Sequence, residues 1–371
     1  MSTVPYAVHV FLRKHIEEAA KKYKVTVVCN STDAHLLHDL NVPVILLPIE
    51  RKPSFWCDAL VVIRLYMLFR REHFAIVHSI MPKTGMIAML AAWLARVPIR
   101  IHTFTGQVWV TKRGLKRAVL KWVDKLIGKF ATCLLADSPS QRDFLVSEGA
   151  LPFGKVKVIA DGSICGVEAA RFHPDSNIMM SVRKDLKISE DAVVILFVGR
   201  LSFDKGILDL AVAFDSIARM CADVVLIIAG AEEDVLIGGI RQLCSRWAER
   251  LHYIKFTSSP ENYMAAADIF CLPSYREGFG MTIIEAAACA VPTVGSCIYG
   301  ITDAVVDGET GLLFPAGNVA ALTLALLVLI KDIDLRQRMG KAARLRALKL
   351  FSSERITGEM VTLYDRLSEV R

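Results

Sequence analysis

The stretch "VVILFVGRLSFDKGILDLAVAF", Val193 to Phe214, predicts one strand, one loop and one helix in succession. An apolar run ends at Gly199, and apolar residues at helical spacing resume after Gly206. Arg200 and Lys205 lie in the polar loop between them, so both cations can approach one point near the start of the helix. That point would suit a phosphate. The alternative is that Arg200 pairs with a carboxylate and Lys205 is a solvated loop side chain.

The same alternation of short β-branched runs and longer amphipathic segments extends along all 371 residues. It is typical of two doubly wound parallel α/β sheets, and the length suits two domains. We expect one domain at 1–178, a second at 179–352, and a C-terminal helix at about 353–371 that packs back on the first. Strands are predicted at 25–30, 42–47, 74–79, 99–103, 133–136, 156–159, 193–199, 224–229, 252–256, 269–272, 292–294 and 312–314.

Composition excludes several classes of protein. Hydrophobic residues make up 53% and mean hydropathy is +0.41, yet no apolar run approaches the roughly 20 residues of a membrane-spanning helix. No secretion signal is recognisable at the start. The nine cysteines occur singly without a CxxC pair, which favours buried thiols in a reducing cytosol and no metal site. GxGxxG and Walker A sequences are absent, which argues against a dinucleotide enzyme and a P-loop NTPase.

A second loop carries two acids in "SYREGFGMTIIEAAACAVPTVGS", Ser274 to Ser296. A helix is predicted to begin near Gly280 or Met281, which puts Glu277 in the loop and Glu285 about one turn inside the helix. Helix-start amides lie between the two acids, whereas a glycosidase needs two carboxyls that face each other. The alternative is that Glu277 is a solvent-facing loop acid and Glu285 a paired core acid.

The segments "VGRLSFDKG", "ADIFCLPSYREGFGMTIIEAAACAVPTVGS" and "DAVVDGETGLLF" together resemble the retaining GT-B glycosyltransferases of glycosyltransferase family 4. The resemblance implies two Rossmann-like domains facing across a cleft, a nucleotide-sugar substrate, and neither cofactor nor metal. It implies that Glu277 contacts the donor sugar and takes part in catalysis, that Glu285 binds the ribose, and that Arg200 and Lys205 neutralise the pyrophosphate. The expected donor-binding residues are Arg200, Lys205, Thr257, Gly278, Phe279, Gly280, Met281, Thr282 and Glu285.

The first half is similar to the family more loosely. The segment "IRIHTFTGQVW" is expected to end a strand at the cleft, with His102 where the family often has a catalytic histidine near the donor sugar. The alternative is a satisfied structural histidine. The segment "VIADGSICGVEAARF" resembles the connection between the family's domains. The start, "MSTVPYAVHVFLRKHIEEA", offers neither the family's first strand nor its Gly-rich loop, so we expect either that the chain is short at its start or that the first domain lacks a central strand.

The first half is also strongly basic, with 24 Lys and Arg against 14 Asp and Glu in residues 1–180. A basic amphipathic helix can lie on anionic lipid, whereas the alternative is a surface helix that packs its apolar side on its own sheet. Nothing indicates a nucleic-acid partner. The helix is predicted from four-residue cation spacing at Arg113, Arg117, Lys121, Lys125 and Lys129, beside Leu115, Val119, Trp122, Leu126 and Phe130.

The resemblance and these features together predict transfer of a sugar from a nucleotide-sugar, with UDP as the expected nucleotide, to a saccharide acceptor. The resemblance to enzymes that build bacterial surface polysaccharide implies an acceptor that is polyprenyl-diphosphate-linked, or another saccharide, at the inner face of a membrane. Two other functions stay open at this point. One is a sugar-nucleotide epimerase or hydrolase of the same fold, and the other is a non-catalytic nucleotide-sugar binding protein.

Overall fold

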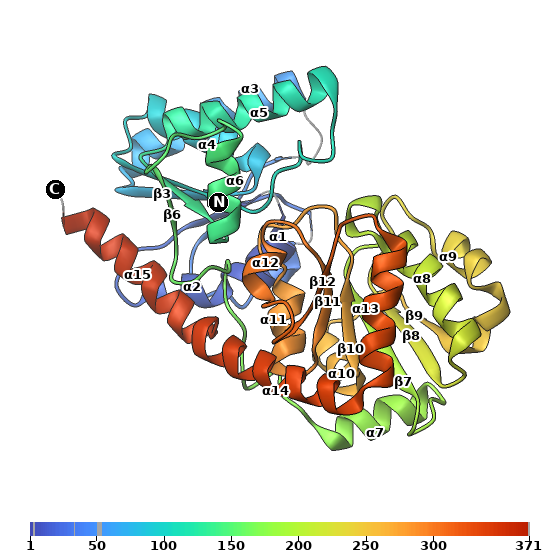
Figure 1. Ribbon diagram of the computed structural model, residues 1–371. Helices are drawn as coiled ribbons and strands as arrows, with labels where there is room; N and C mark the ends of the chain where they lie inside the picture. The colour runs from blue at the N-terminus through green and yellow to red at the C-terminus, as the bar shows by residue number, and fades with distance from the viewer. Residues whose placement is uncertain (3, 33, 50–53, 370–371) are drawn as a thin grey trace. The chain divides into compact units, whose positions relative to one another are not determined.

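The computed structural model describes residues 1–2, 4–32, 34–49 and 54–369, which form two compact units. Unit 1 comprises Met1–Gly166 together with the C-terminal helix α15 (Ser353–Glu369), and unit 2 comprises Val167–Ser352. The structural division therefore falls before Val167, ahead of the 178/179 boundary that the sequence indicates. Helix α15 packs against α2 (Arg13–Ala20), at the red and blue ends of the colour scale in Figure 1.

Unit 2 is built on one parallel sheet with the strand order β12-β11-β10-β7-β8-β9. All six residues of β8 are buried, as expected for a strand covered on both faces. Each strand predicted in this half of the chain forms, and its ends lie within two residues of the predicted ones. The strands are β7 (Val193–Val198), β8 (Val224–Ala229), β9 (Leu251–Ile254), β10 (Ile269–Leu272), β11 (Thr293–Ser296) and β12 (Gly311–Phe314).

Helices cover both faces of this sheet (Figure 1). Their apolar sides and the strands form one continuous core, with Phe197, Phe214 and Phe270 among its largest fully buried side chains. The helical segments are α7 (Ser176–Asp185), η3 (Phe203–Lys205), α8 (Ile207–Met220), α9 (Ile237–Leu243), η4 (Ser245–Arg250), α10 (Pro260–Ala266), α11 (Met281–Ala288), α12 (Ile301–Ala304), α13 (Val319–Lys331) and α14 (Ile333–Leu350).

Unit 1 contains the strands predicted in the first half, but they form two parallel sheets rather than one. One sheet has the order β1-β2 and the other β3-β4-β5-β6, so β1 and β3 are edge strands. The strands are β1 (Val27–Cys29), β2 (Val44–Leu46), β3 (Ile76–Ile80), β4 (Ile99–Phe104), β5 (Cys133–Ala136) and β6 (Val156–Val158).

The beginning of unit 1 is helical, with α1 (Pro5–Ala7), the π-helical turn η1 (Val8–Leu12) and α2 in direct succession. Helix α4 (Pro82–Leu94) packs against both α3 (Phe55–Glu72) and α5 (Gly114–Phe130), and the three lie side by side in Figure 1. The unit is completed by η2 (Ala34–Leu37) and α6 (Pro139–Ser147).

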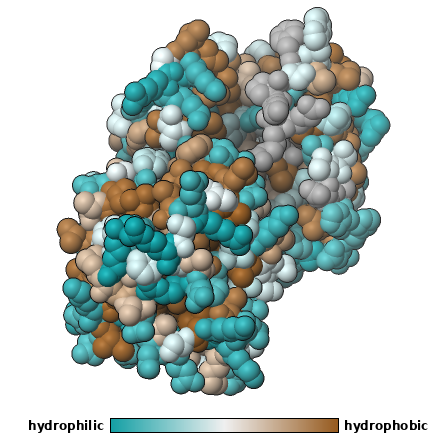
Figure 2. Space-filling model, turned by 90° about the vertical axis from the view of Figure 1, so that its right-hand side faces the viewer, coloured by the Kyte–Doolittle hydropathy of each residue, from teal (hydrophilic) through white to brown (hydrophobic). Residues whose placement is uncertain are grey.

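The high hydropathy of the chain extends to its surface. Brown apolar side chains lie among teal hydrophilic ones over the face shown in Figure 2. Across the residues that the structure describes, no helix combines the length and the apolar character needed to cross a membrane.

Candidate functional site

The order of the strands in unit 2 marks one position on the sheet. Strands β7 and β10 are neighbours, but the chain continues from β7 to β8 on one side and reaches β10 only after β9. In open parallel sheets, ligands bind beyond the carboxyl ends of the strands where the order reverses in this way. The two loops at this position are residues 199–206, after β7, and residues 273–280, after β10.

These two loops are held together by a glycine. Gly206 precedes α8 with φ +67°, and a Cβ on it would lie 2.0 Å from the carbonyl oxygen of Pro273. Only glycine fits both the backbone angle and the space. The loops are also joined by hydrogen bonds, since the Tyr275 amide donates to the Asp204 carbonyl (2.8 Å) and Arg276 Nε donates to Asp204 Oδ2 (2.8 Å).

Lys205 and Glu277 form an ion pair across these loops. Their side chains are 21% and 11% exposed, and Glu277 Oε1 also accepts a hydrogen bond from Ser274 Oγ at 2.9 Å. The structure thus brings together two predicted site residues from loops 72 positions apart. The alternatives were that Lys205 is a solvated loop side chain and that Glu277 is a solvent-facing loop acid. The low exposure of both side chains and their ion pair exclude these alternatives. A lysine ammonium has three N–H donors, so the Glu277 contact leaves Lys205 able to hold a phosphate as well.

Arg200 has a different partner. Its guanidinium pairs with Glu233, and the arginine side chain is 46% exposed. This arrangement matches the alternative that Arg200 pairs with a carboxylate. Because exposed ion pairs contribute little free energy, a bound phosphate can compete for the guanidinium.

The start of α11 is fixed by packing. Gly280 is the N-cap with φ +81°, and the Ile283 amide donates to its carbonyl at 2.9 Å. The Phe279 ring is buried edge-on against Phe351, with ring centroids 5.0 Å apart. A Cβ on Gly300 would lie 2.8 Å from the Gly278 carbonyl oxygen. Phe279 is therefore a core side chain, and residues 278–282 can contribute backbone amides to a ligand.

Glu285 lies in the second turn of α11 and is half-buried. Burial raises its pKa to about 7, while the nearby Arg171 charge lowers it and the Glu261 charge raises it. Arg171 itself is paired with Glu261, its Nε donating to Oε2 at 3.0 Å. Among the described residues, the side-chain carboxyl of Glu285 has no hydrogen-bond partner. It is thus not the paired core acid of the alternative, and its carboxyl can accept hydrogen bonds from a ligand.

Thr257 follows β9, and its Oγ1 accepts a hydrogen bond from the Ser259 amide at 3.0 Å. This contact stabilises its own loop and does not link it to the loops after β7 and β10. Its donor-binding role stays a prediction.

Two serines at the same edge of the sheet escaped the sequence analysis. Ser202 and Ser296 are buried after β7 and at the end of β11, and neither hydroxyl has a hydrogen-bond partner within the described part of the chain. Their position at or after the carboxyl ends of predicted strands could have marked these serines as candidate site residues.

His102 lies on β4. This strand runs one residue past the predicted 99–103, to Phe104, and His102 is fully buried inside it. Its Nδ1 is 2.9 Å from Ser79 Oγ, and a Cβ on Gly85 of α4 would lie 2.3 Å from its Cε1. The strand extends further because Thr103 and Phe104 continue the ladder with β5. Burial lowers its pKa to about 3, so the ring is neutral. Its Nε2 has no hydrogen-bond partner among the described residues, so His102 is not the fully satisfied histidine of the alternative, and its catalytic role stays a prediction.

Over the described residues, no group of three or more His, Cys, Asp and Glu side chains is arranged to hold a metal ion.

Comparison with known proteins assigns this geometry to a family. Residues 180–346 match the model of the glycosyl transferases group 1, and residues 8–162 match that of the glycosyl transferase 4-like domain. The capsular polysaccharide biosynthesis glycosyltransferase CapM of Staphylococcus aureus is 31% identical over 355 residues, 95% of this chain and 93% of CapM. The chain belongs to the group 1 glycosyl transferases.

Other relatives agree with this assignment. A UDP-Gal:α-D-GlcNAc-diphosphoundecaprenol α-1,3-galactosyltransferase of Escherichia coli is 28% identical over 85% of this chain and 81% of its own. Among solved structures, sucrose-phosphate synthase from Thermosynechococcus elongatus has a TM-score of 0.83 at 24% identity, covering 98% of this chain and 94% of that one. Anabaena HepE in complex with UDP has a TM-score of 0.81 at 20% identity, covering 98% of each chain. The fold is GT-B, and the chain is a glycosyltransferase.

Proposed function

We propose that this glycosyltransferase is a retaining, metal-independent enzyme that transfers a hexosyl or N-acetylhexosaminyl group from a UDP-sugar. The proposed acceptor is a polyprenyl-diphosphate-linked saccharide in surface polysaccharide synthesis. The observation that carries the donor assignment is the ion pair of Lys205 and Glu277, because it lies where the strand order of unit 2 reverses.

Each part of this site suits one part of the donor. The Lys205 ammonium and the first amides of α11 attract the pyrophosphate, and the Arg200 guanidinium can leave Glu233 to join them. The carboxylate of Glu277 accepts hydrogen bonds from sugar hydroxyls, and Glu285 accepts them from the ribose. Ribose hydroxyls would supply the donors that Glu285 lacks among the described residues.

The reaction needs no protein nucleophile. The bond between the anomeric carbon and the β-phosphate oxygen breaks, and its electron pair stays on the phosphate. The acceptor hydroxyl attacks from the face that the nucleotide leaves, and a β-phosphate oxygen takes its proton, so configuration is retained. Lys205 and the α11 amides stabilise the negative charge that develops on the leaving phosphate, which is the largest contribution that such a site can make.

A lipid-linked acceptor is supported by two relatives whose names state one. They are the E. coli galactosyltransferase and an N,N'-diacetylbacillosaminyl-diphospho-undecaprenol α-1,3-N-acetylgalactosaminyltransferase of Campylobacter jejuni, 28% identical over 78% of this chain.

The surface of unit 1 supports binding to a membrane. The predicted apolar stripe of α5 is divided. Its first part faces outward, with Leu115 80% and Trp122 58% exposed, whereas Phe130 packs against the core of unit 1. Helix α3 carries a second stripe at helical spacing, with Trp56, Ile63 and Met67 exposed. Two exposed apolar stripes with basic residues beside them suit a lipid surface.

The cations of α5 divide into two groups. Arg117 and Lys121 both pair with Glu148 at 2.9 Å and lie over the Trp109 ring. Lys116, Lys125 and Lys129 are exposed, and no ion pair to a described residue involves them. We assign the lipid contact to this second group, which places the enzyme at the inner face of the membrane as a peripheral protein.

The test is a transfer assay that combines UDP-, GDP- and ADP-sugars with a polyprenyl-diphosphate-linked acceptor in the presence of EDTA. Transfer from one UDP-sugar with an α-linked product, seen in the anomeric NMR signal, is the expected result. An inverted product, or activity that EDTA abolishes, would contradict the mechanism. Rapid consumption of the UDP-sugar without an acceptor would instead indicate a hydrolase or epimerase.

A further inference from the structure

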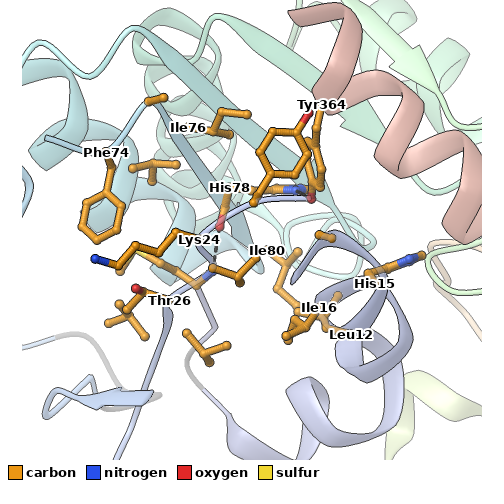
Figure 3. A pocket seen from close by; sticks show the side chains of 18 of the residues that line it. Leu12, His15, Ile16, Lys24, Thr26, Phe74, Ile76, His78, Ile80 and Tyr364 are labelled. Carbon is orange, nitrogen blue, oxygen red and sulfur yellow. Dashed lines mark hydrogen bonds between the residues drawn. The ribbon is translucent and has the colours of Figure 1, made fainter. Parts of the chain in front are cut away.

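The charged and titratable side chains of this chain differ in how firmly their partners hold them. The His78 ring, beside the apolar cavity shown in Figure 3, has both nitrogens engaged, with Nδ1 2.7 Å from the Tyr364 hydroxyl and Nε2 2.8 Å from Thr103 Oγ1. Arg200 of unit 2 is held less firmly. Its side chain is 46% exposed, and that of its partner Glu233 is 36% exposed. Because water reaches both groups, this ion pair can exchange partners at little cost in free energy.

The backbone beside this ion pair is fixed. Glu233 lies in residues 230–236, the loop that follows β8, and β8 pairs with β7. The Leu201 amide donates to the Ala231 carbonyl (2.8 Å), and the Glu233 amide donates to the Leu201 carbonyl (3.1 Å). The loop after β8 is thus joined to the loop after β7 directly beside Arg200. A change of partner by Arg200 therefore requires rotation of side chains and no movement of either loop.

The donor and the product of the proposed reaction differ in charge. Each phosphate of a UDP-sugar is linked on two sides and carries one negative charge. Once the sugar has left, the β-phosphate of UDP is a terminal phosphate, whose second pKa is about 6. Above about pH 7, UDP therefore carries about one more negative charge than the donor, and this charge lies on the phosphate that leaves the sugar. An arginine without a competing partner would bind the product more tightly than the donor.

We propose that Glu233 limits how tightly Arg200 binds the product and so promotes the release of UDP. This inference rests on the proposed function, because it takes a UDP-sugar as the donor. A phosphate gains the full charge of Arg200 only when it displaces the Glu233 carboxylate. The β-phosphate of UDP has the charge to do so and loses part of its binding free energy in the exchange, whereas the donor leaves the ion pair largely in place. Glu233 is thus a positioning residue that acts through Arg200, in a step that sets the turnover of many enzymes.

The test is Glu233→Gln, which removes the charge but keeps a side-chain oxygen that the guanidinium can contact. UDP affinity, measured by titration calorimetry, should rise about three- to fivefold, the upper part of the range for an exposed ion pair. The inhibition constant of UDP as a product should fall by the same factor in an assay of sugar transfer. The KM for the UDP-sugar should fall about twofold at most, because the donor competes less strongly for Arg200. If the Gln variant does not fold, Glu233→Ala provides the same comparison.

Asp234→Asn is the matched control. Asp234 follows Glu233 in the loop, and its Oδ1 accepts a hydrogen bond from the Phe203 amide at 2.9 Å, which an asparagine oxygen can also accept. This variant removes a charge of the same sign from the same loop and leaves the Arg200 contact in place. UDP affinity should therefore change by less than about twofold, because distant exposed charges are screened by salt.

Arg200→Ala combined with Glu233→Gln is the second control. It should bind UDP as Arg200→Ala alone does, because Glu233 acts through Arg200.

Equal gains in UDP affinity from Glu233→Gln and Asp234→Asn would overturn the proposal, because they would reveal only a general effect of negative charge. A gain that persists without Arg200 would overturn it as well, and so would unchanged UDP affinity in Glu233→Gln. Failure of the proposed function has a different signature, since the wild type itself would then bind neither UDP nor a UDP-sugar.

Discussion

Lys205 and Glu277 form an ion pair between the two loops that leave the neighbouring strands β7 and β10. Both side chains are largely buried, and the pair lies at the reversal of strand order where parallel sheets bind ligands. We propose that this cation binds the phosphates and this anion the hydroxyls of the same donor.

Lys205→Ala should weaken UDP binding about ten- to a hundredfold, because a charge-assisted hydrogen bond to phosphate contributes about 1.5–3 kcal/mol. Titration calorimetry measures the effect. Arg200→Ala is the matched comparison, and a smaller loss is expected because this side chain is more exposed and already paired with Glu233. Unchanged UDP affinity in both variants would remove the phosphate role from this loop.

Glu277→Gln and Glu285→Gln should fail differently. If Glu277 holds the sugar, its amide variant should bind free UDP nearly as the wild type does while transfer is lost. Glu285→Gln should weaken binding of UDP itself, because the ribose loses its acceptor. Calorimetry with UDP and an assay of sugar transfer separate the two results. Equal UDP affinity of the wild type and Glu285→Gln would refute the ribose assignment.

The raised pKa of Glu285, about 7, predicts a pH dependence. Because the pKa in the folded protein lies above the ordinary glutamate value of 4.5, the unfolded chain releases this proton at lower pH than the folded protein does. The free energy of unfolding should therefore fall as pH rises from 4.5 to 7. A carboxylate is also the better acceptor for ribose, so UDP affinity should increase between pH 6 and 8. Urea unfolding and calorimetry across this range measure both effects. Glu285→Gln should show neither the fall in the free energy of unfolding nor the rise in UDP affinity. If its pH profiles equal those of the wild type, the assignment of these effects to Glu285 is wrong.

Gly206→Ala should destabilise the protein by more than 2 kcal/mol, which exceeds the ~1–2 kcal/mol usual for a left-handed residue. The added Cβ would lie 2.0 Å from the Pro273 carbonyl oxygen, so the two site loops must separate. Gly308→Ala is a close control, since Gly308 has φ +76° and nothing within 4 Å of a Cβ. In Gly206→Ala, urea unfolding should show a lower free energy of unfolding, and UDP binding should be weaker. In Gly308→Ala, UDP binding should be unchanged.

The strands were predictable from sequence because a strand buried on both faces reads as a continuous apolar run. β8 is an example, with all six residues buried. The pairing of Lys205 with Glu277 was not predictable, since it depends on the order of strands in the sheet and the residues are 72 positions apart. Likewise, no local pattern shows that α4 covers β4 at Gly85 and so encloses His102. The division of unit 1 into two sheets follows from pairing between strands, which apolar runs do not encode.

The outward face of α5 was also hidden from sequence analysis, because an apolar stripe looks the same whether it faces a sheet or a membrane. Exposure of Leu115 and Trp122 shows that this part of the stripe does not pack on the sheet, and the pairing of Arg117 and Lys121 with Glu148 shows which cations are already engaged. A variant that reverses the engaged cations would disrupt the fold locally and would not isolate the lipid contact.

Changing Lys116, Lys125 and Lys129 together to Glu should therefore release the enzyme from vesicles that contain acidic lipid. Each cation near an anionic surface contributes about 1 kcal/mol, and the reversal adds repulsion. Wild-type binding should also fall as salt rises, because the attraction is screened within about 10 Å at 0.1 M. Cosedimentation measures both effects, and transfer to a short water-soluble acceptor should persist because the donor site lies in unit 2. If the triple variant cosediments as the wild type does, α5 is not the lipid contact.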